Sequence, residues 1–246
     1  MKTQIYHTLN SGIYLRKDNV GLAVDILHSG TVFNMHAMSE GLLNDMRTAQ
    51  GIFSEIDALL FTHVHCDHFN KQILEEFRAT PKGSHVPVYC PGYNKSDLPR
   101  TKISKRTDCS VVGPFTIYFV TNVHDADAYK DMYHRSIIIK TEDETILVAG
   151  DAKLDATDIT EIKQHVCDHI DTAIINPFQA VQNDGRVFLK EFSTDKILIY
   201  HIPDKKIDKN SYGFIAKTAK KTWPAELPIP FVFPQFSFAG QIPNIA

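Results

Sequence analysis

Several features that would place a chain in a specialised class are scarce or missing in these 246 residues. There are four cysteines and no Cys-x-x-Cys pair, so we expect free thiols in a reducing compartment. No apolar run approaches the roughly 18 residues of a membrane span, and the N-terminal segment lacks the apolar stretch of a signal peptide. We therefore expect a cytoplasmic protein with no membrane partner.

An excess of charge of either sign is also missing. The formal net charge is −3 and no long run of like charge occurs, so nucleic acid is not required as a partner. Hydrophobic residues make up 43% and charged residues 22%, which is ordinary for a globular protein with a real core. Neither a change of composition nor an internal repeat divides the chain, so we expect one domain over residues 1–246.

Short apolar runs alternate with helical patterns along the chain. The runs are rich in β-branched residues and predict strands at 21–26, 57–62, 86–90, 115–120, 135–140, 145–150, 172–176 and 197–201. Helical patterns lie at 39–50, 70–80, 156–170 and 211–223, with Ser39 and Asn70 as candidate N-caps. The segment KTEDET (140–145) predicts a hairpin turn. Strands that alternate with helices predict an α/β layered domain.

The segment THVHCDHFN (62–70) concentrates titratable groups in one loop. His63, His65, Asp67 and His68 carry ligand atoms that suit zinc and other divalent first-row metals. The two histidines at 63 and 65 point the same way in an extended chain, whereas Asp67 and His68 lie where the chain turns. One loop could therefore serve two metals a few ångströms apart.

Four donors from one loop do not complete two metal sites, so further ligands are expected at the ends of other predicted strands. His124 follows the strand at 115–120, Asp151 ends the strand at 145–150, and His201 ends the strand at 197–201. Gly150 lets the backbone approach the site closely.

This order of residues resembles the metallo-β-lactamase superfamily. The resemblance rests on THVHCDH, VHD, AGD and YHIP between residues 63 and 201, and GLAVDI with Asp25 resembles the start of the family. It implies an αββα four-layer sandwich with the metals at one edge, between the two sheets. Carried over by position, the resemblance implies two divalent metal ions, the first bound by His63, His65 and His124, the second by Asp67, His68 and His201, with Asp151 bridging both.

The resemblance also implies a metal-dependent hydrolase. A bound divalent ion lowers the pKa of its water to near 7, so that a metal-bound hydroxide can attack a carbonyl or phosphoryl centre. Asp67 would orient the proton of the nucleophile, and His134 or Tyr133 is a candidate proton donor to the leaving group. The alternative for His134 is a polar residue at a strand start. Zinc suits the histidine-rich first site, and manganese or iron suits the second.

Within the superfamily, the chain is most similar to the branch of the ascorbate-6-phosphate lactonases and related metal-dependent hydrolases. This similarity implies a small cytosolic metabolite with an ester-type bond, namely a lactone, a phosphoester or a thioester. The segment 91–108 is a solvated loop or a rim that attracts an anionic substrate, through Lys95, Arg100, Lys102, Lys105 and Arg106. Alternative functions are a metal-dependent phosphodiesterase or nuclease acting on nucleic acid or cyclic nucleotides, and a non-catalytic metal-bound sensor.

Other candidate ligands have simpler interpretations. His165 and His169 are four residues apart on a predicted helix, but they lack the Glu of a His-Glu-x-x-His motif and are expected at the surface or in half-buried packing. His28 and His36 flank a loop and are possible substrate contacts. Cys66 takes the variable position of the ligand motif and is expected to be a bystander thiol, with a thiolate ligand as the alternative.

Overall fold

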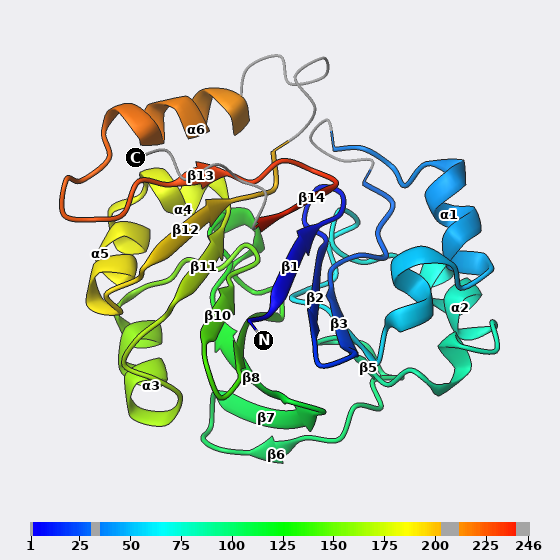
Figure 1. Ribbon diagram of the computed structural model, residues 1–246. Helices are drawn as coiled ribbons and strands as arrows, with labels where there is room; N and C mark the ends of the chain where they lie inside the picture. Colours follow the sequence, from blue (N-terminus) through cyan, green and yellow to red (C-terminus); the bar gives the residue numbers. More distant parts are fainter. Residues whose placement is uncertain (1, 31–34, 203–211, 240–246) are drawn as a thin grey trace. The chain divides into compact units, whose positions relative to one another are not determined.

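The computed structural model describes residues 2–30, 35–202 and 212–239, and its internal contacts separate two compact units (Figure 1). Unit 1 contains Met1–Leu98 and Pro234–Ala246, and unit 2 contains Pro99–Phe233. The single domain over 1–246 stays a prediction, and each unit is described by itself. In the described ranges, no helix is both long enough and apolar enough to cross a membrane.

Unit 1 is built on a six-stranded sheet in the order β14-β1-β2-β3-β4-β5. Its strands are β1 (Gln4–His7), β2 (Ile13–Lys17), β3 (Val20–Val24), β4 (Ala58–Leu60), β5 (Val88–Tyr89) and β14 (Ser237–Phe238). Pairing is antiparallel from β14 to β3 and parallel from β3 to β5. Its helices are α1 (Glu40–Arg47) and α2 (Lys71–Arg78), with the 3₁₀ helices η1 (Gly51–Glu55) and η2 (Gly83–His85).

The two helices of unit 1 begin where the sequence predicts. The Ser39 side chain accepts the N–H of Leu42 at the start of α1, and the Asn70 side chain accepts the N–H of Ile73 at the start of α2. Leu74 and Phe77 of α2 lie in one core cluster with residues of β3, β4 and β5. Helix α2 therefore anchors the far end of the histidine-rich loop to the sheet.

Unit 2 is built on an eight-stranded sheet in the order β13-β12-β11-β10-β9-β8-β7-β6. Its strands are β6 (Thr101–Lys102), β7 (Thr107–Val112), β8 (Phe115–Asn122), β9 (His134–Lys140), β10 (Thr145–Val148), β11 (Thr172–Ile175), β12 (Lys196–Ile199) and β13 (Phe231–Val232). Strands β10 to β13 pair in parallel and the others in antiparallel fashion. Its helices are η3 (Asp127–Tyr129), α3 (Ala156–His165), α4 (Pro177–Val181), α5 (Asn183–Glu191) and α6 (Tyr212–Lys221).

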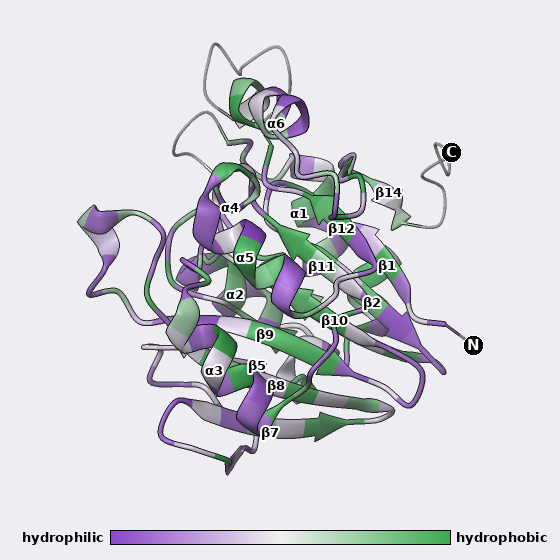
Figure 2. Ribbon diagram, turned by 90° about the vertical axis from the view of Figure 1, so that its left-hand side faces the viewer, coloured by the Kyte–Doolittle hydropathy of each residue, from purple (hydrophilic) through white to green (hydrophobic). Residues whose placement is uncertain are grey.

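Residues on both faces of the unit 2 sheet are buried. Ala173 of β11 packs in one cluster with Ile162 of α3 and Phe188 of α5, whereas its neighbour Ile174 points to the opposite face and is also fully buried. Figure 2 shows β11 as largely hydrophobic and β9 as hydrophobic over part of its length. Burial on both faces accounts for the unbroken apolar runs of these strands.

All eight predicted strands are present, and the hairpin at KTEDET is confirmed by the pairing of Lys140 with Thr145. The predicted helix 156–170 is too long, because the N–H groups of Val166 and Cys167 both bond the carbonyl of Ile162 and close the last turn at His165. The predicted helix 211–223 corresponds to α6, and Ser211 lies outside the described residues. The segment 91–108 is less loop-like than expected, since it contains β6 and the start of β7.

Candidate metal-binding residues

The histidine-rich loop leaves the C-terminal end of β4 and folds into a tight turn. The N–H groups of His68 and Phe69 both bond the carbonyl of His65, at 2.9 and 2.7 Å. The carbonyl of Cys66 accepts the N–H of Ser29 at 2.8 Å, which ties the middle of the loop to the segment after β3. This turn brings together four donors that are adjacent in the sequence.

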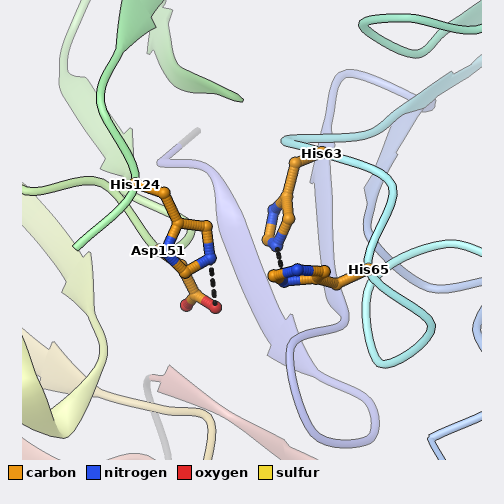
Figure 3. Close-up of side chains that lie close together, drawn as sticks. All are labelled: His63, His65, His124 and Asp151. Atoms are coloured by element: carbon orange, nitrogen blue, oxygen red, sulfur yellow. Dashed lines mark hydrogen bonds and ion pairs between the residues drawn. The ribbon is translucent and has the colours of Figure 1, made fainter. Parts of the chain in front are cut away.

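His63 and His65 face each other in unit 1. Figure 3 shows Nε2 of His63 directed at Nδ1 of His65, and the two nitrogens are 2.9 Å apart. Two nitrogens that each lie about 2.05 Å from a tetrahedral ion are separated by about 3.3 Å. His63 is fully buried, and its Nδ1 lies 3.0 Å from Oγ1 of Thr62. The pair is therefore placed to share one ion.

His68 is held by a buried carboxylate. Nδ1 of His68 lies 2.8 Å from Oδ2 of Asp25, which also accepts the Thr62 hydroxyl at 2.7 Å. Oδ1 of Asp25 accepts the Thr62 N–H at 2.8 Å. Metal-binding histidines commonly donate their second ring N–H to such a carboxylate, which fixes the tautomer. Nε2 is therefore the nitrogen with which His68 would bind an ion.

Asp67 lies beside His68 and is 3% exposed. One carboxylate oxygen of Asp67 and one ring nitrogen of His68 lie within 4.8 Å of each other. The backbone carbonyl of Asp67 accepts the hydroxyl of Ser11 at 2.5 Å, which holds the turn. Unit 1 thus presents two donor pairs, one of two imidazoles and one of a carboxylate and an imidazole.

The predicted ligands of unit 2 lie at one edge of its sheet. Asp151, Asn176 and His201 follow the neighbouring parallel strands β10, β11 and β12, so all three emerge from the same edge. His124 follows β8, and its backbone forms an isolated antiparallel bridge with Ala152. His201 is 1% exposed and has a φ of 60°.

His124 is directed at Asp151. Nε2 of His124 lies 3.7 Å from Oδ2 of Asp151, the contact drawn in Figure 3. Nδ1 of the same ring lies 3.0 Å from the N–H of Ala126 and 3.1 Å from Oδ1 of Asp125. Because Nδ1 accepts the N–H of Ala126, the orientation of the ring is fixed and Nε2 is turned toward Asp151.

His134, the candidate proton donor, is the first residue of β9 and is fully buried. Its Nε2 accepts the backbone N–H of Asp151 at 3.0 Å. This contact positions the backbone of a predicted ligand, and the role of His134 in proton transfer stays a prediction. Tyr133, the other candidate donor, is 63% exposed.

Two buried amides that the sequence analysis does not single out surround Asp151. Nδ2 of Asn176 donates to Asp151 at 2.9 Å and to Asp125 at 3.0 Å. Nε2 of Gln179 donates to the carbonyl of Gly150 at 3.1 Å. The order Asn-Pro-x-Gln directly after a strand is a capping-box pattern, and it is the sequence signal that could have found them.

The remaining histidines have local contacts. Nε2 of His28 lies 3.1 Å from the carbonyl of Leu9, and the backbone of His36 bonds Asn10. Part of the loop between them, residues 31–34, lies outside the described residues. His165 is exposed, as expected. His169 is exposed too and lies 3.2 Å from Asp195 on the surface of unit 2.

Three of the five cations in the segment 91–108 are in ion pairs with acidic side chains. Arg106 bonds the buried carboxylate of Asp158. The other two pairs join Arg100 to Asp108 at 3.8 Å and Lys95 to Glu75 at 3.0 Å.

No protein-family model matches the sequence, and no curated protein matches it at a significant level. Solved structures do match. A possible metal-dependent hydrolase from Veillonella parvula DSM 2008 is 14% identical, with a TM-score of 0.65 over 97% of this chain and 99% of that chain. The isothiocyanate hydrolase from Delia radicum gut bacteria is 13% identical, with a TM-score of 0.62 over 96% and 97%. CmlA, a diiron beta-hydroxylase from Streptomyces venezuelae, is 12% identical, with a TM-score of 0.58 over 96% of this chain and 54% of that chain.

These likenesses show the fold. They confirm the expected mixed α/β class, with two large sheets and their helices. The diiron hydroxylase among them illustrates that one fold supports more than one chemistry.

Proposed function

We propose that this protein is a metal-dependent hydrolase. The observation that carries the proposal is the loop 63–68, which presents four donors and in which His68 is oriented by the buried carboxylate of Asp25. A carboxylate behind a histidine is the usual support of a metal ligand. Two of the structures with a similar fold are named as hydrolases, which supports this class of reaction.

Two divalent ions are proposed as the cofactors. A catalytic ion typically takes three protein ligands and keeps one position for water or substrate, so the two donor pairs of the histidine-rich loop each need further ligands. The resemblance in residue order supports the assignment of His63, His65 and His124 to one ion, of Asp67, His68 and His201 to the other, and of Asp151 to both. Imidazole-rich donors suit zinc, and the carboxylate-bearing second set also suits manganese or iron.

A divalent ion bound by these residues lowers the pKa of its water to near 7 and polarises the bond to be cleaved. Asp67 would accept and orient the proton of the attacking water. Because Nε2 of His134 accepts a backbone N–H, the neutral ring carries its proton on Nδ1, and we propose this proton for the leaving group.

A small metabolite with an ester-type bond, namely a lactone, a phosphoester or a thioester, is the proposed substrate. Nucleic acid is a weaker candidate, because a phosphate backbone needs several available cations and three of the five in 91–108 have acidic partners. All four cysteines are free thiols, which supports a cytosolic setting.

The first experiment is metal analysis by mass spectrometry of protein purified without chelator or affinity nickel. We expect about two ions per chain, fewer in Asp151→Ala, and an unchanged number in the surface variant His165→Ala. Lactones, phosphoesters and thioesters are then tested with that metal before and after chelation. A wild-type protein that holds no metal and takes none up on incubation would contradict the proposal.

A further inference from the structure

One amide group in unit 2 serves two carboxylates. Asn176 is the first residue after β11 and is 1% exposed. Its Nδ2 lies 2.9 Å from Oδ1 of Asp151 and 3.0 Å from Oδ2 of Asp125. An amide nitrogen carries two hydrogens in fixed directions, so both are used by these two acceptors.

The same two carboxylates lie on opposite sides of the His124 ring. Oδ1 of Asp125 is 3.1 Å from Nδ1 of the ring, and Oδ2 of Asp151 is 3.7 Å from Nε2. Asn176 therefore joins the carboxylate beside Nδ1 of His124 to the carboxylate that Nε2 of His124 faces. Because Oδ1 of Asp151 accepts the amide, Oδ2 is the oxygen that it turns toward Nε2 of His124.

The orientation of this amide is fixed by the start of α4. Oδ1 of Asn176 accepts the N–H of Gln179 at 3.0 Å, and the N–H of Asn176 donates to Oε1 of Gln179 at 2.8 Å. Since the amide oxygen is the helix cap, the amide nitrogen has to face the two carboxylates. Nε2 of Gln179 donates to the carbonyls of Gly150 and Ala152, at 3.1 and 2.7 Å, and so holds the backbone on both sides of Asp151.

We propose that Asn176 and Gln179 are positioning residues that set the spacing between His124 and Asp151 and direct Oδ2 of Asp151 toward Nε2 of His124. The proposal rests on the proposed function, because it concerns the same ligands. Helix capping alone needs only the side-chain oxygen at position 176, which serine or aspartate provides equally well. We call the two hydrogen bonds from Nδ2 of Asn176 to Asp151 and Asp125 the amide clamp, and they require both hydrogens of the amide nitrogen.

Substitution can separate the cap from the clamp. Asn176→Ser keeps a cap oxygen and removes both donated hydrogens. Asp155→Ser is the matched control, because Asp155 caps α3 in the same unit through a capping box of its own. Zinc affinity is measured by competition with a chromophoric chelator, and the visible absorption of bound cobalt reports the ligand geometry. Melting temperature without metal reports folding.

We expect Asn176→Ser to melt within about 3 °C of the wild type and to bind zinc roughly 10- to 100-fold more weakly, with an altered cobalt spectrum. Asp155→Ser should match the wild type in both metal measurements. Wild-type affinity and spectrum in Asn176→Ser would overturn the clamp and leave the hydrolase proposal standing. A wild-type protein that binds neither zinc nor cobalt would overturn both proposals.

If Asn176→Ser melts far below the wild type, zinc affinity and the cobalt spectrum are measured on Asn176→Asp instead. This variant keeps the side-chain volume and the cap oxygen, removes the donated hydrogens, and places a third carboxylate beside Asp125 and Asp151. Lower zinc affinity than the wild type supports the clamp. Equal affinity with an unchanged cobalt spectrum overturns it.

Discussion

Nδ1 of His68 lies 2.8 Å from Oδ2 of Asp25, a residue 43 positions earlier in the chain, and both side chains are fully buried. Asp25 follows β3 and Thr62 follows β4, and these two strands are parallel neighbours. The carboxylate therefore reaches the histidine-rich loop from the adjacent strand end and bonds both Thr62 and His68.

Asp25→Asn should weaken metal binding about 10- to 100-fold, because one of the two carboxylate oxygens becomes an NH2 group that cannot accept. Either the Thr62 N–H at Oδ1 or the Thr62 hydroxyl and His68 at Oδ2 would then lose its acceptor. Asparagine tolerates the φ of 54° at this position, so the backbone is expected to be retained. Zinc affinity from chelator competition is the measurement. Asp18→Asn is the control, since Asp18 has a φ of 49° and an exposed side chain. Equal affinities in the two variants would show that His68 does not depend on Asp25.

His65→Ala should lower metal affinity and hydrolysis by more than the roughly 100-fold expected for loss of a supporting residue. The reason is that the substitution removes one of the two ring nitrogens that face each other 2.9 Å apart. Metal stoichiometry and kcat/KM are measured together, with the exposed His85→Ala as the control. Wild-type activity in His65→Ala would exclude the proposed use of metal.

Arg106→Met should destabilise the protein by about 3 kcal/mol in urea denaturation, because it leaves the buried carboxylate of Asp158 without its guanidinium partner. Burial raises the pKa of Asp158, so the folded state tolerates its neutral form. Because the pKa of Asp158 is raised in the folded state, its contribution to the free energy of unfolding is largest at low pH and is lost as the pH rises. The loss of stability in Arg106→Met should therefore be smaller near pH 4, where Asp158 is more often neutral, than at pH 7. The exposed Lys105→Ala should be neutral at both values. A cost independent of pH would contradict the role of the ion pair.

Cys167 should react with iodoacetamide as a thiol of high pKa. Burial raises its pKa from 9.0 to about 11, so at pH 8 its thiolate fraction is roughly 100-fold lower than in the unfolded chain. Rates are measured between pH 7 and 11 by peptide mass mapping, in buffer and in urea. Because the pKa of Cys167 is raised in the folded state, its contribution to the free energy of unfolding is present below pH 9 and is lost between about pH 9 and 11. A native rate that follows the pH dependence seen in urea would contradict the shift.

The predictions from sequence are most accurate where the signal is local. Strands that are buried on both faces need continuous apolar residues, so β9 to β12 are evident as runs of isoleucine, leucine and valine. The short strands β6, β13 and β14 have two residues each and carry no such pattern. Helices α4 and α5 contain Pro177, Asn183 and Gly185, which act as turn signals in isolation.

The candidate ligands are likewise found from local sequence, whereas the residues that hydrogen-bond to them are not. The four donors of the histidine-rich loop lie together because a single turn contains them. Asn176 contacts Asp151 and Asp125 across 25 and 51 positions of sequence. Such contacts depend on the strand order of the sheet, which the sequence pattern of one strand does not determine. A supporting carboxylate or amide is therefore harder to find than the ligand it supports.

The pairing of β1 with β14 makes unit 1 discontinuous in the chain. His7 lies opposite Ser237, so unit 2 is a topological insertion within unit 1. A gene fragment that ends at residue 98 would encode the histidine-rich loop but would leave the backbone edge of β1 open to pairing with other chains. Fragments for expression, and breakpoints for recombination with related proteins, should therefore keep residues 234–239 together with the N-terminal segment.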